Sequence, residues 1–185
     1  MKSVLMEWKV VIAMLRVGFM VFLAVAAWQD FRKHHISVNV LVIFGIIGGS
    51  LRCMQVILEM EMLGQEMPGQ GMPSQGMPEW SQIYGILGRH LWDLGLGAGV
   101  GGVLLALSYA AREAIGKGDG WFFVVSGMYL GVSRNLFLLA GGLGLCFLAG
   151  LALIVRGIIQ GRSVRQLSLP FLPYLIPAGI GVMLL

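Results

Sequence analysis

The chain has 185 residues, of which 57% are hydrophobic and 12% are charged, and its mean hydropathy is +0.84. A soluble domain carries about 25% charged residues, so the composition excludes an ordinary soluble domain. It predicts an all-α, polytopic membrane protein with about six transmembrane helices in a single membrane-embedded domain. The net charge of +4 does not indicate a nucleic-acid partner, because the basic residues are dispersed at the ends of apolar segments, as the positive-inside rule describes.

Metal and cofactor chemistry find little support in the residue types. Cys53 and Cys146 are the only cysteines and have no metal-ligand spacing, so we expect free thiols in apolar surroundings. His34 and His35 have no third ligand nearby in the sequence, which favours contact with lipid headgroups or substrate over a metal site. No cofactor and no metal are therefore expected.

The first two spans lie on either side of a short polar loop at residues 30–35. A bilayer core of about 30 Å requires about 20 helical residues, and residues 10–28 meet this length as an uncleaved first span. Arg16 interrupts this span and must face other helices or reach an interface. The second span begins at residue 36 and continues beyond residue 51 if Arg52 faces inward or reaches the interface.

A low-complexity segment follows the second span. Three pentapeptides that end in Met-Pro lie between residues 64 and 78. Proline and glycine at this density exclude a helix or a paired strand, so residues 63–79 are expected to form a flexible extracytoplasmic loop. A dispensable insertion is favoured over a methionine-rich metal site, because three evenly spaced thioethers separated by prolines are a weak copper-binding pattern.

An interfacial helix is predicted at residues 79–93, where aromatic and polar residues alternate with apolar ones. The third span, residues 94–111, opens with five glycines that permit close approach of another helix. Asp93 stands immediately before these glycines and is expected to cap their helix.

The last three spans are predicted at residues 121–133, 136–155 and 167–185, with a turn at Arg134 and Asn135. The fourth span reaches only about 21 Å, so the end that carries Asp119 is expected below the membrane surface. The sixth span contains prolines that would free backbone carbonyls, which are tolerated only against protein or a wet cavity: Pro170, Pro173 and Pro177.

The distribution of lysine and arginine predicts the orientation. Seven of them fall in loops on one side of a six-span topology and five on the other. The positive-inside rule places the larger set in the cytoplasm, with both chain termini outside. Asp30 and Asp119 then lie on the same, cytoplasmic side of the membrane.

These two acids are the candidate catalytic residues. A carboxylate costs roughly 2.5–3.5 kcal/mol at the centre of a membrane helix, so an acid in an apolar chain indicates function. Two carboxylates close together share one proton. The ionised one can activate water, and the protonated one can donate to a peptide carbonyl. Gly116, Lys117 and Gly118 would form the active-site loop, where glycines let an extended substrate approach the backbone.

Structural roles remain open for the same residues. Asp30 could simply end a helix near the interface, and Asp119 is well placed to cap the fourth helix. Lys117 could contact substrate or anionic lipid, or it could be a solvated charge that follows the positive-inside rule.

Three motifs resemble those of the type IV prepilin peptidases. Gly116-Lys117-Gly118-Asp119 matches the GxGD motif of intramembrane aspartyl proteases. Asp30, followed six residues later by Ile36, resembles the first-aspartate motif of the prepilin peptidases, which ends in Ile-Pro-Asn. The stretch from Leu169 to Tyr174 is similar to the family's Pro-Phe-x-Pro-Phe stretch before the last span.

The chain departs from the family pattern at two places. Ser37 and Val38 replace the proline and asparagine after Ile36, and Trp121 stands where the family usually has a lysine. A cysteine-rich segment is also absent from the sequence, so the chain resembles the short, peptidase-only members and N-methyltransferase activity is not expected.

The resemblance implies a function and a location. The function is a two-aspartate endopeptidase in a bacterial or archaeal cell membrane, which removes the leader of a pilin-like precursor on the cytoplasmic side without a cofactor. A presenilin-like protease fits less well, because its first aspartate lies in a different motif. A transporter or secretion-system subunit that binds a proton or ion at Asp119 is the alternative from another class.

Overall fold

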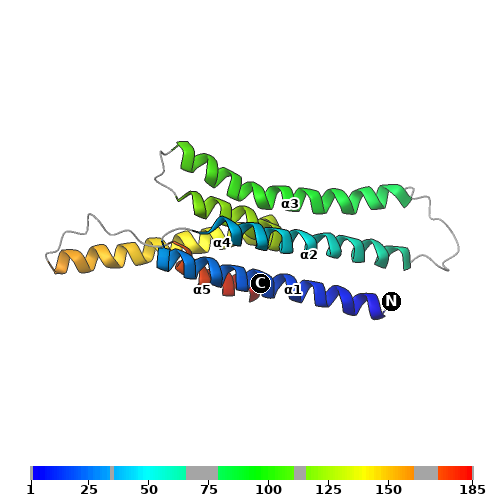
Figure 1. Ribbon diagram of the computed structural model, residues 1–185, viewed down its shortest axis with the longest axis horizontal. Coiled ribbons are helices and arrows are strands. Elements are labelled where there is room, and N and C mark those ends of the chain that lie inside the picture. Colours follow the sequence, from blue (N-terminus) through cyan, green and yellow to red (C-terminus); the bar gives the residue numbers. More distant parts are fainter. Residues whose placement is uncertain (1, 34–35, 66–78, 111–115, 161–170, 185) are drawn as a thin grey trace.

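The computed structural model describes residues 2–33, 36–65, 79–110, 116–160 and 171–184, and almost all of these residues are helical (Figure 1). The helices are α1 (Lys2–Lys33), α2 (Val38–Gln65), α3 (Glu79–Ala110), α4 (Lys117–Ile159) and α5 (Leu172–Leu184). The predicted all-α class is therefore confirmed for the described part of the chain. Four of these helices are long and apolar enough to cross a membrane, and the predicted count of six spans is not confirmed.

Helix α4 is a hairpin of two arms rather than one straight helix. Gly131 has φ 73° and ψ −178°, which is not helical, and glycine adopts such a positive φ without the strain that a side chain would add. The Ser126 hydroxyl donates to Asn135 Oδ1 at 2.7 Å, although nine residues of straight helix would separate the two backbones by about 13 Å. The chain thus reverses at Gly131, and the prediction of a turn at Arg134 and Asn135 was wrong.

One further prediction of element boundaries was wrong. Residues 79–93 and 94–111 do not form two helices, because α3 is continuous from Glu79 to Ala110. Asp93 therefore lies inside α3 and does not cap it. The sixth predicted span is represented by α5, which has 13 residues with Pro177 inside it. Residues 66–78 of the predicted loop, the two histidines at 34 and 35, and residues 161–170 lie outside the described residues.

The core lies where α1, α2 and the first arm of α4 meet. The Phe22 and Phe122 rings stack with centroids 4.9 Å apart, and Phe44 lies 5.3 Å from Phe22. The Tyr129 hydroxyl donates to the Phe44 carbonyl at 2.7 Å, so a buried polar group is satisfied. A Cβ on Gly48 would lie 2.6 Å from the Tyr129 ring. The absence of a side chain at this position therefore leaves room for the ring to pack against α2.

Glycines let α3 and the first arm of α4 pack backbone to backbone (Figure 1). A Cβ on Gly97 would lie 2.9 Å from the Gly127 carbonyl oxygen, and one on Gly101 would meet the Val124 nitrogen and lie 2.6 Å from the Gly120 carbonyl oxygen. Small residues are enriched at such interfaces in membranes, where van der Waals contact drives helix association. The prediction that the glycines of residues 94–111 allow close helix approach is confirmed for these two positions.

A buried amide joins the same helices. Asn135 is fully buried, and its Nδ2 donates to the Gly97 carbonyl at 2.8 Å and to the Phe123 carbonyl at 3.0 Å. Its Oδ1 accepts the hydrogen bond from Ser126. The Asn135 side chain therefore links the second arm of α4 to the first arm and to α3 by hydrogen bonds.

The Asn135→Ala variant is expected to lower the free energy of unfolding by about 1–3 kcal/mol, because it leaves the Ser126 hydroxyl without its acceptor and two carbonyls without this donor. Unfolding of the purified protein in detergent, followed by circular dichroism against temperature, measures the change. Ser133→Ala, at an exposed position on the same arm, is the matched control. Equal stability of the two variants would contradict this role of Asn135.

Candidate active site

Asp30 lies in the last helical turns of α1, three residues before its end at Lys33. Its Oδ2 accepts a hydrogen bond from the backbone N–H of Leu172 at 3.2 Å. Leu172 is the first residue of α5, and the N–H groups of a first helical turn have no partner within their own helix. Asp30 therefore reaches across from α1 and holds the start of α5.

Asp119 lies in the first turn of α4, where a negative charge is favoured by the helix dipole. Gly116 occupies the cap position in an extended conformation (φ −62°, ψ 124°), and no side chain makes a cap hydrogen bond there. The alternative that Asp119 caps this helix is therefore wrong. A Cβ on Gly116 would lie 3.0 Å from Asp119 Oδ2, so the carboxylate lies back beside this glycine.

Asp30 and Asp119 are close enough for their charges to interact. The charge of Asp30 acts on the Asp119 carboxyl group, and both side chains are half-buried. Their segments also touch, because a Cβ on Gly118 would be 3.6 Å from the Ile36 side chain. Ile36 is itself buried in the core. The structure thus brings the loop after Asp30 against the GxGD segment, as the pairing of the two acids requires.

The start of α5 is the third wall of this site. Leu172 is fully buried, and the Phe171 ring lies 6.3 Å from the Phe123 ring of α4. The three segments singled out in the sequence, at the end of α1, the start of α4 and the start of α5, therefore converge. Residues 169 and 170 of the proline-containing stretch lie outside the described residues.

The prediction that Gly116, Lys117 and Gly118 form a loop was wrong for two of them, because α4 begins at Lys117 and only Gly116 precedes it. Lys117 is exposed, and its Nζ lies 5.5 Å from the centre of the Tyr109 ring of α3, a geometry that suits a cation–π contact. Trp121, which stands at the position of the family's lysine, is about half exposed. Trp121 carries no charge, so it cannot replace the ammonium group of that lysine.

Two partners of the site were not anticipated from the sequence. Gln29, next to Asp30, accepts a hydrogen bond from the Ser37 N–H at 2.9 Å and so closes the turn between α1 and α2. The second partner is the Leu172 N–H. The only feature of the sequence that indicated a helix start at Leu172 is the proline that follows it, Pro173. Proline is common in a first helical turn, which marks a helix start but does not say which side chain meets it.

The arrangement suits proton transfer more than metal binding. Across the described residues, no three His, Cys, Asp or Glu side chains are grouped so as to hold a metal ion. In general, two carboxyl groups close to one another can share one proton. Such a pair has one group able to accept a proton and one able to donate it.

Comparison with known proteins gives no match: no family model, no curated protein and no solved structure is significantly similar to this chain. The motifs and the geometry of the site are therefore the basis for a functional assignment.

Proposed function

We propose that this protein is a membrane aspartic endopeptidase in which Asp30 and Asp119 activate water and protonate the scissile peptide. The observation that carries the proposal is the packing of the segment after Asp30 against the segment that holds Asp119, where a Cβ on Gly118 would lie 3.6 Å from the Ile36 side chain. These two segments are far apart in sequence, and the charge of Asp30 acts on Asp119 across this contact. The ionised carboxylate takes a proton from the attacking water. The protonated one donates to the carbonyl oxygen and then helps the amine to leave.

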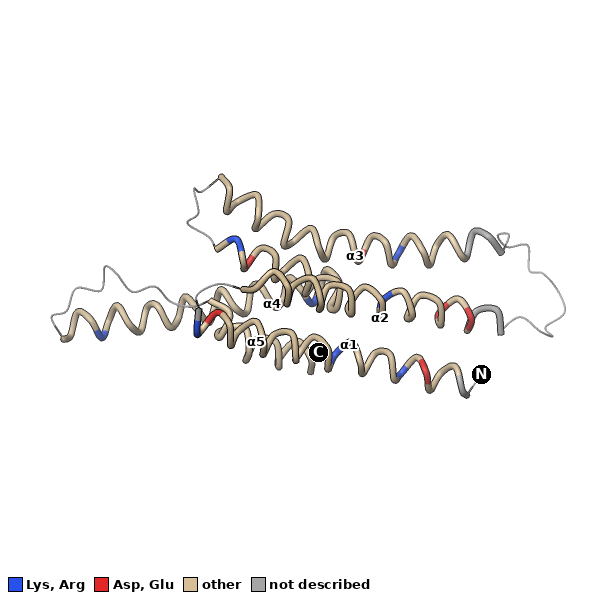
Figure 2. Tube along the Cα trace, in the orientation of Figure 1, with Lys and Arg blue, Asp and Glu red and all other residues tan. Residues whose placement is uncertain are grey.

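The proposed substrate is a pilin-like precursor, cleaved on the cytoplasmic side between its leader and its hydrophobic helix. The resemblance of the motifs around Asp30 and Asp119 to the prepilin peptidases supports this choice. The apolar surfaces of the four long helices also support a site at a membrane (Figure 2), because charged residues are sparse along them.

A cleavage assay tests the proposal. The purified protein is reconstituted in lipid vesicles with a pilin-like precursor from the same organism, and the products are identified by mass spectrometry. A single cut just before the hydrophobic segment is the expected result. Intact precursors together with proton or ion flux across the vesicle membrane would instead favour the transporter that was the alternative from the sequence.

The two glycines of the GxGD segment are expected to differ in their tolerance of a methyl group. Gly116→Ala should slow leader removal about tenfold, because its Cβ would press on Asp119 Oδ2 at 3.0 Å and misplace a reacting group. Gly118→Ala should stay within about twofold of wild type, because its Cβ would make an ordinary contact with Ile36 at 3.6 Å. Initial cleavage rates measure both, and a larger loss for Gly118→Ala would contradict this geometry.

A further inference from the structure

A second polar site lies far along the helices from the two aspartates. A partly open cavity of about 260 Å³ is lined by residues of α1, α2, α4 and α5. Three arginines line it, one from each of three helices: Arg16, Arg52 and Arg134. Arg52 and Arg134 are close enough for their charges to repel one another, so the cavity gathers positive charge.

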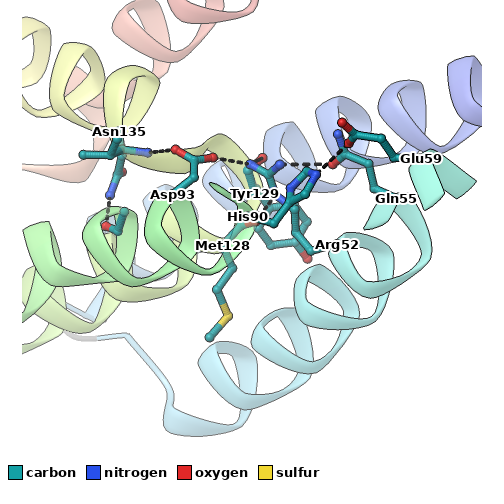
Figure 3. Close-up of polar contacts among 10 residues, drawn as sticks. Arg52, Gln55, Glu59, His90, Asp93, Met128, Tyr129 and Asn135 are labelled. Atoms are coloured by element: carbon teal, nitrogen blue, oxygen red, sulfur yellow. Dashed lines mark hydrogen bonds and ion pairs between the residues drawn. The ribbon is translucent and has the colours of Figure 1, made fainter. Parts of the chain in front are cut away.

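One of these arginines, Arg52, already has partners within the protein. Arg52 Nε donates to the Met128 carbonyl at 2.8 Å, and its Nη2 lies 3.6 Å from Asp93 Oδ2 (Figure 3). Asp93 Oδ1 in turn accepts a hydrogen bond from the Val132 N–H at 2.9 Å. Asp93 thus caps the second arm of α4, and its carboxylate is the counter-ion of Arg52.

Three other side chains at the cavity carry donors that have no acceptor among the described residues. Within the described part of the chain, no ion pair or hydrogen bond joins Arg16 or Arg134 to another residue. The indole nitrogen of Trp8, which also lines the cavity, is buried and has no hydrogen-bond partner among the described residues. Two guanidinium groups and one N–H donor therefore face a space that could hold an anion, and arginine is well suited to phosphate oxygens.

An apolar groove continues from this cavity. It has a volume of about 390 Å³, shares Arg16 and Met183 with the cavity, and follows α1 as far as Ala24. Eight helical residues correspond to about 12 Å, directed from Arg16 toward the end of α1 that carries Asp30. A phosphate site that opens onto an apolar groove parallel to the helices has the shape of a headgroup and an acyl chain.

We infer that the cavity and the groove bind one anionic phospholipid, with its phosphate among Arg16, Arg52 and Arg134 and an acyl chain along α1 toward Ala24. Arg16 is exposed in an otherwise apolar span, where an unpaired charge is costly, and the lipid phosphate supplies its counter-ion. Given the predicted orientation, with the aspartates on the cytoplasmic side, the lipid belongs to the extracytoplasmic leaflet. The inference does not depend on the proposed peptidase activity.

Native mass spectrometry of the full-length, delipidated protein tests this site. Dioleoyl-phosphatidylglycerol and dioleoyl-phosphatidylcholine are added in separate titrations, and the bound fraction is measured. Wild type is expected to retain phosphatidylglycerol about tenfold better than phosphatidylcholine. The double variant Arg16→Gln, Arg134→Gln should lose this preference, and Ala24→Trp should weaken retention of phosphatidylglycerol by filling the groove.

Two controls decide the source of the anion. Arg89→Gln, at an exposed position of α3 outside the cavity, should retain phosphatidylglycerol like wild type, and an equal loss there would show that only general charge is involved. Inorganic phosphate should not displace the lipid at equal concentration. Displacement by phosphate, or full retention by Ala24→Trp, would overturn the lipid assignment in favour of a free-anion site, and circular dichroism checks that every variant is folded.

Discussion

Asp119→Asn is expected to reduce cleavage of a pilin-like precursor by at least about a hundredfold, the range lost when a general acid or base is removed. The amide keeps the size of the carboxylate but cannot accept a proton from water. Asp119 makes no cap hydrogen bond to α4, so the variant should fold like wild type. Co-expression with the precursor, followed by the gel shift on leader removal, measures the effect.

Asp30 requires a pair of variants, because it also holds the start of α5 through the Leu172 N–H. Asp30→Asn keeps an oxygen that can accept this hydrogen bond, since asparagine caps helices about as well as aspartate. It should therefore lose activity as fully as Asp119→Asn but keep its stability. Asp30→Ala should lose activity and also about 1 kcal/mol of stability, the usual cost of a missing cap.

Glu61→Gln is the matched control, since it neutralises an exposed acid on α2 and should process the precursor normally. Full processing by either asparagine variant would rule out the two-aspartate mechanism. Loss of activity in Asp30→Ala alone, with normal processing by Asp30→Asn, would instead assign Asp30 a structural role in positioning α5.

Long apolar runs were sufficient to predict the all-α class, but the position where α4 reverses could not be predicted from the sequence. Arg134 and Asn135 are the conspicuous polar residues between two apolar segments, and they suggested the turn. In the structure Asn135 is buried and its amide pairs with carbonyls of α3 and α4, while Gly131 takes the positive φ. A polar residue thus signals either a loop or an internal hydrogen bond, and only the packed neighbours distinguish the two.

Asp93 shows the same limit for charged residues. From the sequence it could be assigned only to the nearest helix start, which follows it directly. Its actual partners are Arg52, on α2, and the Val132 N–H, in α4, and both are long-range contacts. For Asp30 and Asp119 the sequence predicted a common side of the membrane, because an even number of predicted spans separates them. That sidedness stays a prediction, while the interaction of their two charges is seen in the structure.

The glycine-lined contact of α3 with α4 gives the largest expected effect on stability. Gly101→Ala should lower the free energy of unfolding by about 3 kcal/mol, the upper range for overpacking a core. Its Cβ would meet the Val124 nitrogen and the Gly120 carbonyl oxygen, and backbone atoms cannot rotate away as a flexible side chain can. Separation of the two helices would also disturb Asp119, which precedes Gly120 in the first turn of α4.

Gly99→Ala is the matched control, two residues away on the same helix, because its Cβ would meet nothing within 4 Å. It should stay within about 1 kcal/mol of wild type, the range of helix propensity between the two residues. Thermal unfolding of both variants in the same detergent measures the difference, with precursor cleavage as a second readout. Equal unfolding temperatures for Gly101→Ala and Gly99→Ala would contradict the close approach of α3 to α4. They would also contradict the placement of Asp119, which depends on that contact.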